Sequence, residues 1–236
     1  MRECEDNYYD FLSFPLQVLP NVKEVKHARM PVRQLKEYEK CIVTIFGIGK
    51  NLAAETALRQ LYPSKCHFYG LDPSPDPNKK LLESINGTYY QAAIASKFSM
   101  KDAVLLTNNG YKHFTIKHEA LEDYLKNQLE KTDIIDWASV DIEGGEVELF
   151  PSFLRGGTFD KLNITICQLN MELHLEKDKP NDNAAIYEFL HDATIEKRYM
   201  FMKVARPYFN RITYYAVNIK DPNCVNRYVK NDLYWL

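Results

Sequence analysis

Carboxylate and imidazole side chains stand where two apolar runs of this 236-residue sequence end. Asp141 and Glu143 close one run, and Glu172 and His174 close another. Two carboxylates at the end of a buried strand are costly unless something pairs with them. Residues 172 and 174 would face one side of a continuing strand, so they are candidates to orient or deprotonate a hydroxyl. A buried hydrogen-bonded pair is the equal alternative.

A glycine turn after a third apolar run is a candidate ligand site. The run from Cys41 to Phe46 ends at Gly47 and Gly49, and a helical pattern follows until Pro63. Glycine allows the backbone to approach a ligand closely, and the N-terminus of a helix offers unpaired N–H groups. Glycines between a strand and a helix are also ordinary turn residues. These residues alone leave both interpretations open.

Asp72 ends the next apolar run and begins a proline-rich loop over residues 73–78. In doubly wound nucleotide sites, an acidic residue at the end of the second strand binds ribose hydroxyls, roughly 20 residues beyond the glycines. The spacing from Gly47 fits that role. The alternative is an aspartate that opens a proline turn. The position beside the glycine turn favours the ligand role.

The composition argues against several classes of protein. The length suits one large domain, and a net charge of −2 with dispersed basic residues argues against nucleic acid as a partner. No apolar run is long enough to span a bilayer. Glu146, in the first turn of a predicted helix, is explained by the helix dipole.

The five cysteines form no C-x-x-C pair. Cys41, Cys66 and Cys167 lie in apolar runs, where cysteine behaves as a small hydrophobic residue, and this predicts a reducing, cytoplasmic location. A longer precursor with a targeting segment stays open. The sequons that begin at Asn86 and Asn163 would matter only in a secreted form.

Strands and helices alternate along the chain and predict a doubly wound sheet. We expect an N-terminal segment over residues 1–37 and one domain over 38–236. The predicted elements are a helix at 31–40, a strand at 66–71, a helix at 78–85, a strand at 89–94, a strand-rich insert at 97–118, a helix at 121–129, a polar loop at 176–182, a helix capped by Asn183, and strands at 199–204 and 212–219. The last two strands are close enough in sequence to form an antiparallel hairpin.

With these motifs in place, the chain resembles the FkbM-type family of class I S-adenosylmethionine-dependent methyltransferases, particularly the branch much expanded in nematodes. The resemblance implies an α/β, Rossmann-like, doubly wound and mostly parallel seven-stranded sheet with a C-terminal antiparallel hairpin. It covers about residues 38–220. The motifs that carry it are Ile45-Phe-Gly-Ile-Gly49, Phe68-Tyr-Gly-Leu-Asp72, Ser139-Val-Asp-Ile-Glu-Gly-Gly-Glu146, Ile166-Cys-Gln-Leu-Asn-Met-Glu-Leu-His174 and the strand Tyr214–Asn218.

The resemblance also implies roles for individual residues. The glycines would border the methionine part of the cofactor, Asp72 the ribose, and Ala92 and Ala93 the adenine. The implied cofactor-binding residues are Gly47, Gly49, Asp72, Ala92, Ala93, Asp141 and Glu143, and the implied catalytic residues are Asp141, Glu172 and His174. The chain departs from the family pattern at Ile45, where an acidic residue is usual, and at Asn51, which replaces a third glycine.

The predicted function is S-adenosylmethionine-dependent O-methylation of a small-molecule or sugar hydroxyl. One alternative is a non-catalytic binding domain that keeps the fold, which Ile45 and Asn51 favour. An NAD-dependent oxidoreductase is a further alternative, although Leu52 occupies the place of its third glycine. Carboxylate and imidazole groups could bind a metal, but no ligand spacing demands one, and we predict none.

Overall fold

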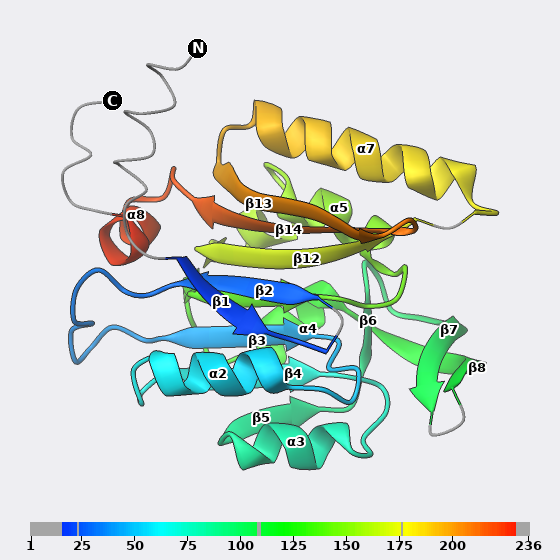
Figure 1. Ribbon diagram of the computed structural model, residues 1–236, viewed down its shortest axis with the longest axis horizontal. Coiled ribbons are helices and arrows are strands. Elements are labelled where there is room, and N and C mark those ends of the chain that lie inside the picture. The colour runs from blue at the N-terminus through cyan, green and yellow to red at the C-terminus, as the bar shows by residue number, and fades with distance from the viewer. Residues whose placement is uncertain (1–15, 23, 108–109, 176, 230–236) are drawn as a thin grey trace.

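The computed structural model describes residues 16–22, 24–107, 110–175 and 177–229. Its centre is a seven-stranded sheet in the order β13-β14-β12-β10-β3-β4-β5 (Figure 1). These strands are β3 (Ile42–Phe46), β4 (His67–Leu71), β5 (Gly87–Tyr90), β10 (Trp137–Val140), β12 (Gln168–His174), β13 (Tyr199–Tyr208) and β14 (Arg211–Asn218). Only β14 runs antiparallel to its neighbours, β12 and β13. The Rossmann-like sheet with its terminal hairpin is therefore confirmed.

The central strands are buried on both faces, which explains their continuous apolar sequences. Every residue of β3 is buried, and this strand pairs in parallel with β4 on one side and β10 on the other. The register places Ile45 opposite Gly70 and Ser139. Since parallel strands end at the same edge, the residues after β3, β4, β10 and β12 come together there.

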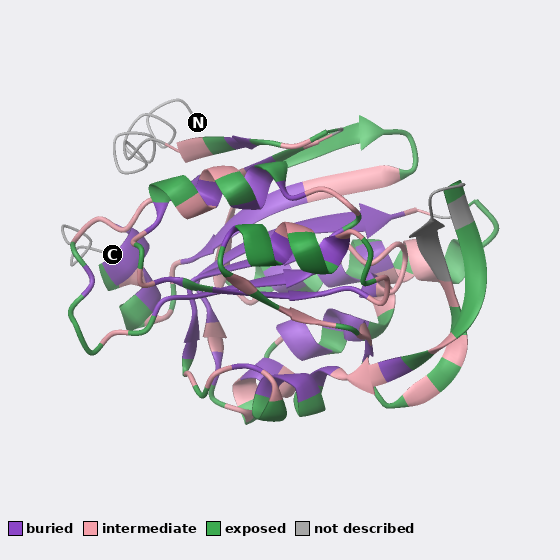
Figure 2. Ribbon diagram, turned by 90° about the horizontal axis from the view of Figure 1, so that it is seen from below, coloured by how far each residue is buried: buried purple, intermediate pink, exposed green. Residues whose placement is uncertain are grey.

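Helices cover both faces of the sheet (Figure 2). One apolar cluster joins the sheet to α4 (Leu121–Asn127), α5 (Glu146–Phe153), α6 (Thr158–Lys161) and α7 (Pro180–Ile195). A second cluster, on the other side, joins it to α2 (Ala53–Leu61), α3 (Asn78–Ser84) and α8 (Pro222–Tyr228). Two short parallel strands, β9 (Ile134–Ile135) and β11 (Thr165–Ile166), precede β10 and β12.

The N-terminal segment contributes an antiparallel hairpin of β1 (Leu16–Pro20) and β2 (Val25–Arg29). The side chain of Asn170 in β12 holds this hairpin, because it accepts a hydrogen bond from the N–H of His27 at 2.8 Å and donates one to its carbonyl at 2.9 Å. Gln168 accepts a further bond from the N–H of Arg29 at 2.7 Å. The hairpin thus packs against the sheet at β12, beside α2.

The prediction of a helix at residues 31–40 is wrong. This stretch is irregular, and it is fixed by tertiary contacts: Val32 N–H donates to the carbonyl of Arg227 at 2.8 Å, and Arg33 pairs with Glu39 at 2.6 Å. A short helix needs an apolar face to pack, and here Leu35 is buried while Tyr38 is 77% exposed. The aromatic-rich stretch from Tyr8 to Phe14 lies outside the described residues.

The predicted insert is present as a separate three-stranded sheet of β6 (Ala93–Ala95), β7 (Ser99–Thr107) and β8 (Gly110–Ala120). The predicted strand over residues 89–94 is divided between the two sheets. Its first part belongs to β5, and Ala93 instead pairs with His118 of β8. The β7–β8 hairpin projects from the main sheet (Figure 1).

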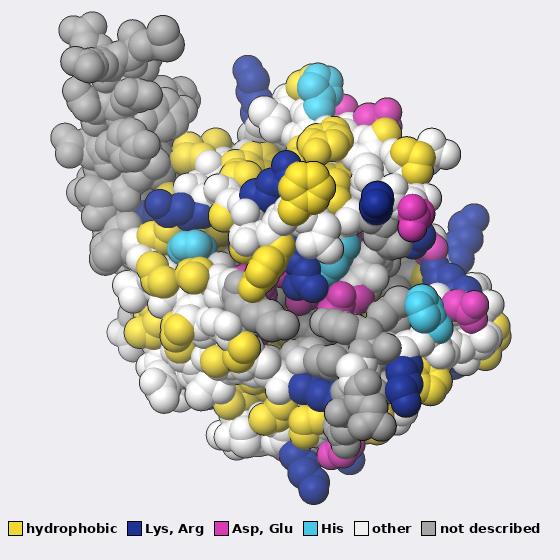
Figure 3. All heavy atoms as spheres, turned by 45° about the vertical axis from the view of Figure 1, so that its right-hand side comes forward, with side chains coloured by type: hydrophobic (Ala, Val, Ile, Leu, Met, Phe, Trp, Pro, Cys, Tyr) yellow, Lys and Arg dark blue, Asp and Glu magenta, His cyan; other side chains and the backbone are white. Residues whose placement is uncertain are grey.

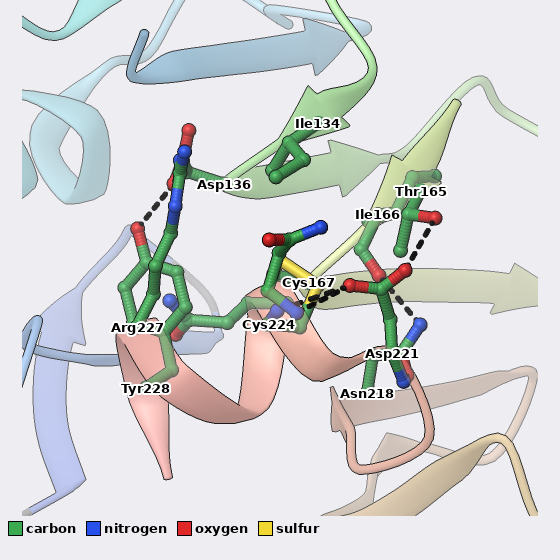
Figure 4. Close-up of a disulfide and its surroundings, with 12 residues drawn as sticks. Ile134, Asp136, Thr165, Ile166, Cys167, Asn218, Asp221, Cys224, Arg227 and Tyr228 are labelled. Carbon is green, nitrogen blue, oxygen red and sulfur yellow. Dashed lines mark hydrogen bonds and ion pairs between the residues drawn. A yellow bond between two sulfur atoms is a disulfide. The ribbon is translucent and has the colours of Figure 1, made fainter. Parts of the chain in front are cut away.

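Two disulfides correct the prediction of free thiols. Cys41 is bonded to Cys66, and Cys167 is bonded to Cys224 in α8 (Figure 4). The bonded residues are far apart in the sequence, so their pairing depends on how the strands assemble. The cytoplasmic prediction rested on free thiols and loses that basis. No helix in the described ranges has the length and apolar character needed to cross a membrane.

Candidate active site

A cavity of about 500 Å³ opens at the carboxyl ends of the parallel strands. All of the residues predicted to bind the cofactor line it: Gly47, Gly49, Asp72, Ala92, Ala93, Asp141 and Glu143. On the face shown in Figure 3, acidic side chains lie together near the middle, with basic and histidine side chains beside them. The volume lies within the range of roughly 300–1,000 Å³ that is usual for small-molecule pockets.

The two glycines of the turn are required for different reasons. Gly47 has a φ of +85°, and a Cβ built there would lie 1.7 Å from the carbonyl oxygen of Asp141. This glycine is therefore needed for the packing of β3 against β10. Gly49 has a φ of +62°, but its Cβ would meet nothing within 4 Å. Gly49 thus leaves the backbone open to a ligand, whereas Gly47 serves the fold.

Asp72 holds the glycine turn through its carboxylate. Its Oδ2 accepts hydrogen bonds from the N–H groups of Ile48 at 3.0 Å and Gly49 at 3.2 Å, and its Oδ1 accepts one from Ser74 at 2.8 Å. The side chain is nearly buried at the cavity wall. Asp72 therefore shapes the loop that borders the cavity, in addition to any contact with a ligand.

Ile45 brings no charge to this cavity. Its side chain is fully buried in the apolar cluster beneath α2, while Phe46 lines the cavity. The cavity instead has the carboxylate of Asp72 at this turn, and those of Asp141 and Glu143 after β10.

His174 lies at the centre of a group of carboxylates. Its Nδ1 is 3.1 Å from Glu146 Oε1, and its Nε2 is 3.3 Å from both Glu143 and Glu172 and 3.9 Å from Asp141. Burial alone would lower the pKa of His174, but the surrounding carboxylates of Glu143, Glu146 and Glu172 outweigh it and raise that pKa far above the ordinary value. The imidazole is therefore protonated at neutral pH and has no free lone pair to accept a proton.

Glu146 has a structural role that sequence reasoning missed. Its Oε1 accepts a hydrogen bond from the N–H of Ile142 at 2.8 Å, and its Oε2 accepts one from Gly144 at 3.0 Å. The side chain is 1% exposed and also binds His174. The helix dipole accounts for an acidic residue at this position, but it gives no sign of the histidine that Glu146 orients.

Asp141 is the titratable group best placed to accept a proton. Burial raises its pKa to about 7, although the charges of His174 and Lys26 oppose that rise. Its Oδ1 atom is buried and accepts no hydrogen bond within the described part of the chain. A carboxyl group with a pKa near neutrality is well matched to general-base chemistry.

A second cavity of about 240 Å³ adjoins the first at Asp141. Residues of the β1–β2 hairpin form one wall, and residues of β10, β12, β13 and β14 form the others. Its polar or charged lining residues include Glu24, Lys26, His27, Asn170, Glu172 and Lys203. The first three were missed, because their position depends on the contacts that Asn170 makes with the hairpin.

Glu172 and His174, predicted as a pair, lie in different surroundings: one lines this cavity and the other is in the interior. Glu172 lines the second cavity and pairs with Arg211 at 2.5 Å. Glu24, across from it, has a pKa raised to about 7 by burial and by its hydrogen bond with Glu172. His174 stands behind these carboxylates and is buried. Glu172 thus contacts the cavity, whereas His174 supports it.

Asp141, Glu172 and His174 also form a group that could hold a metal ion. One ligand atom from each lies within 4.8 Å of the others, and such ligands suit divalent cations. The protonated ring of His174 would first have to lose its proton. Its positive charge already lies among the carboxylates that a cation would bind.

The insert and α7 border the larger cavity on its outer side. Lys101, His113 and His118 come from β7 and β8, and Lys179 and Asp182 come from the start of α7. The prediction that Asn183 caps this helix is wrong, because the helix begins at Pro180. Proline is favoured in the first turn of a helix. Residues 180–182, which were predicted as part of the polar loop, therefore belong to α7.

Comparison with known families identifies the chain. A model of the methyltransferase FkbM domain matches residues 7–197, which is most of the sequence. The chain belongs to the FkbM methyltransferase family. Its cofactor is S-adenosylmethionine. This membership confirms the resemblance seen in the sequence motifs. It gives no support to the oxidoreductase alternative.

Solved structures similar to this FkbM methyltransferase include a human methyltransferase 10 domain containing protein, with 14% identity and a TM-score of 0.42 over 80% of this chain and 76% of that one. Another is a SAM-dependent methyltransferase from Aquifex aeolicus, with 11% identity and a TM-score of 0.39 over 76% and 82%. A third is M. capricolum TrmK in complex with S-adenosyl-homocysteine, with 13% identity and a TM-score of 0.38 over 77% and 63%. No curated protein matched the sequence.

The cavity of this FkbM chain suits the family's cofactor. It combines an open backbone at Gly49, a carboxylate at Asp72 and apolar walls at Phe46 and Ile94. The Oδ1 of Asp141 accepts no hydrogen bond within the described residues and lies 3.9 Å from the Nε2 of His174, so it can accept a hydrogen bond from a ligand. An amphipathic ligand with hydroxyl groups and a charged end fits this set of side chains.

Proposed function

We propose that this protein transfers a methyl group from S-adenosylmethionine to a hydroxyl of a small polar molecule, such as a sugar. The observation that carries the proposal is the position of Asp141, which among the described residues is the one that lines both cavities. One carboxylate therefore faces the site suited to the cofactor and the site available to an acceptor.

In this proposal Asp141 takes the proton of the acceptor hydroxyl. Its pKa of about 7 leaves a large fraction of the carboxylate ionised at neutral pH, so it can accept a proton without being too weak a base. Bound S-adenosylmethionine supplies an electrophilic methyl group. Much of the rate would come from holding the hydroxyl in line with that group, since orientation alone is worth several kcal/mol, roughly 7–11 in favourable cases.

His174 is a positioning residue in this scheme. It binds Glu143, Glu146 and Glu172 with short contacts and keeps a positive charge near Asp141. That charge limits the rise in the pKa of Asp141. Of the two roles that the sequence left open for His174, orienting or deprotonating, this proposal assigns it the first, through the carboxylates that it contacts.

The second cavity favours a compact, hydroxylated acceptor. Its lining carries side chains of both charges, namely Lys26 and Lys203 with Glu24 and Glu172. Among the described residues that line this cavity, this balance gives no continuous basic surface for a polyanion. A sugar or another polyol would find hydrogen-bond donors and acceptors among these charged side chains and apolar contacts with residues such as Met171 and Tyr214.

Removal of the Asp72 carboxylate should weaken cofactor binding. Asp72→Ala loses contacts to a charged group and the anchors of the glycine turn, so we expect the affinity for S-adenosylhomocysteine to fall roughly 10–150-fold. Isothermal titration calorimetry of the variant against wild type would measure this. Glu83→Ala, on the exposed side of α3, is the matched control and should bind normally. Unchanged affinity in Asp72→Ala would overturn its assignment.

Chelation of metals should leave the activity unchanged. The charge of His174 occupies the place in which a divalent cation would neutralise the carboxylates. The measurement is methyl transfer by the enzyme after EDTA treatment and desalting, with and without added Mg²⁺ or Mn²⁺. A loss of activity that either cation restores would show that the cluster of Asp141, Glu172 and His174 works as a metal site.

A non-catalytic binding domain is the second candidate. The observation in its favour is the buried, uncharged Ile45 at a place where the family has a carboxylate. A thermal-shift experiment with S-adenosylmethionine and S-adenosylhomocysteine distinguishes the two functions, because a ligand that binds the folded state raises its melting temperature. No shift at high ligand concentration would favour the binding domain over the enzyme.

A further inference from the structure

Four cysteines of the described chain are bonded in two pairs at the edge of the sheet opposite the active site. Cys41 and Cys66 precede the adjacent strands β3 and β4, and Cys167 precedes β12. All four side chains are buried. Since the carboxyl ends of these strands form the cavities, the disulfides stand at the opposite ends and take no part in the reaction. Their position is that of structural cross-links.

The second disulfide, between Cys167 and Cys224, lies among many hydrogen bonds and ion pairs (Figure 4). Beside it, Asp136 is fully buried and accepts hydrogen bonds from Arg227 and Tyr228 of α8, both at 2.7 Å. The Cys167–Cys224 bond fixes the same helix to the start of β12. Structural disulfides form and persist in oxidising compartments and are rare in the cytosol.

The two sequons give an observation that is independent of the cysteines. Asn86 lies between α3 and β5, and Asn163 lies between α6 and β11. Both asparagines are exposed, with φ angles of +57° and +53°. Neither side-chain amide makes a hydrogen bond within the described residues. Asparagine is favoured in this conformation at the end of a helix, but that preference does not require the threonine two residues later.

Both asparagines also lie on the side of the molecule away from the cavities. Each stands immediately before strands whose other ends face the active site, as the disulfides do. A bulky hydrophilic glycan requires a surface position, and one attached here would not cover the cavity. The folded structure therefore accommodates glycans at both sequons without blocking a substrate.

We propose that the chain matures in an oxidising secretory compartment and carries N-linked glycans on Asn86 and Asn163. In each glycosylation, a C–N bond forms between the sugar anomeric carbon and the asparagine Nδ2. The bond from that carbon to the phosphate of a lipid-linked oligosaccharide breaks, and the amide proton leaves with the lipid pyrophosphate. For each disulfide, two thiols lose two protons and two electrons to an oxidised dithiol carrier of the compartment. The proposal does not depend on the reaction that the enzyme catalyses.

The test uses the full-length protein isolated from its native source under alkylating conditions. Peptide mass spectrometry after deglycosylation by peptide N-glycosidase in ¹⁸O-water should show labelled aspartate at positions 86 and 163. The four described cysteines should escape alkylation until a reductant is added. Unlabelled asparagine at both sequons, or alkylated thiols at Cys41, Cys66, Cys167 and Cys224 before reduction, would overturn the proposal.

Variants provide a second measurement on the protein expressed in cells of its own source. Asn86→Gln and Asn163→Gln should each remove one step of the mobility shift that deglycosylation causes, and the double variant should remove both. Asn127→Gln changes an exposed asparagine that lies outside any sequon, so it should migrate as wild type does. A double variant with the same mobility as the untreated wild type would contradict the assignment.

Discussion

Replacing Asp141 with asparagine is expected to lower kcat about 10²–10⁴-fold, the usual contribution of a general base. The amide keeps the shape of the side chain but cannot accept the hydroxyl proton. In the wild type, the rate should rise with pH through about 7, where the Asp141 carboxyl loses its proton, and should then level off. Asp141→Asn should lose this rise. Initial-rate measurements between pH 5 and 9, with saturating S-adenosylmethionine, would test both expectations.

The matched control is Asp123→Asn, because Asp123 is an exposed carboxylate on α4 outside both cavities. Its pH profile should coincide with that of the wild type. Cofactor affinity should be determined for each variant, since Asp141 also borders the cofactor cavity. If Asp141→Asn kept the wild-type kcat and pH profile, Asp141 would not be the base.

His174→Gln should destabilise the protein and move the pH profile toward higher pH. The substitution removes a buried cation from among carboxylates, and breaking such a pairing costs about 3–5 kcal/mol of folding free energy. The pKa of Asp141 should also rise, because the positive charge that lowers it is lost. The rate should therefore fall at neutral pH and recover in part in alkaline buffer, in contrast to Asp141→Asn.

The loss of stability should itself depend on pH. The pKa of His174 is raised in the folded protein above its ordinary value of 6.5. Its stabilising contribution is therefore fully present below about pH 6.5 and declines as the pH rises above it. Urea unfolding of His174→Gln should show a larger deficit at pH 6 than at pH 9. His191→Gln, which alters an exposed histidine on α7, is the control.

Together, Asp141→Asn and His174→Gln distinguish the two possible roles of His174, as the base or as a positioning residue. If His174 were the base, His174→Gln would depress the rate at every pH and abolish the rise of the rate with pH. If it positions Asp141 and Glu172, the midpoint moves and alkaline buffer restores activity. The contacts of the ring with three glutamates favour the second outcome.

Local sequence patterns were sufficient for most of the sheet. The strands β3, β4 and β10 are buried on both faces of the sheet. Their continuous apolar sequences therefore predict that they are central strands. The helix predicted at 31–40 failed because its local propensity was weak and its contacts, such as that of Val32 with Arg227, come from distant parts of the chain. The start of α7 was misplaced because a capping asparagine was preferred to the proline three residues earlier.

The sequence by itself determined that Gly49, Asp72, Asp141, Glu143 and Glu172 would gather at one edge, because they follow parallel strands and parallel strands end together. Only the tertiary structure decided their chemistry. The protonation of His174 depends on Glu146, and the second cavity depends on a hairpin held by Asn170. The disulfides depend on which strands become neighbours. Charge, pKa and covalent pairing arise from distances of a few ångströms between residues far apart in the sequence, and no local pattern encodes those distances.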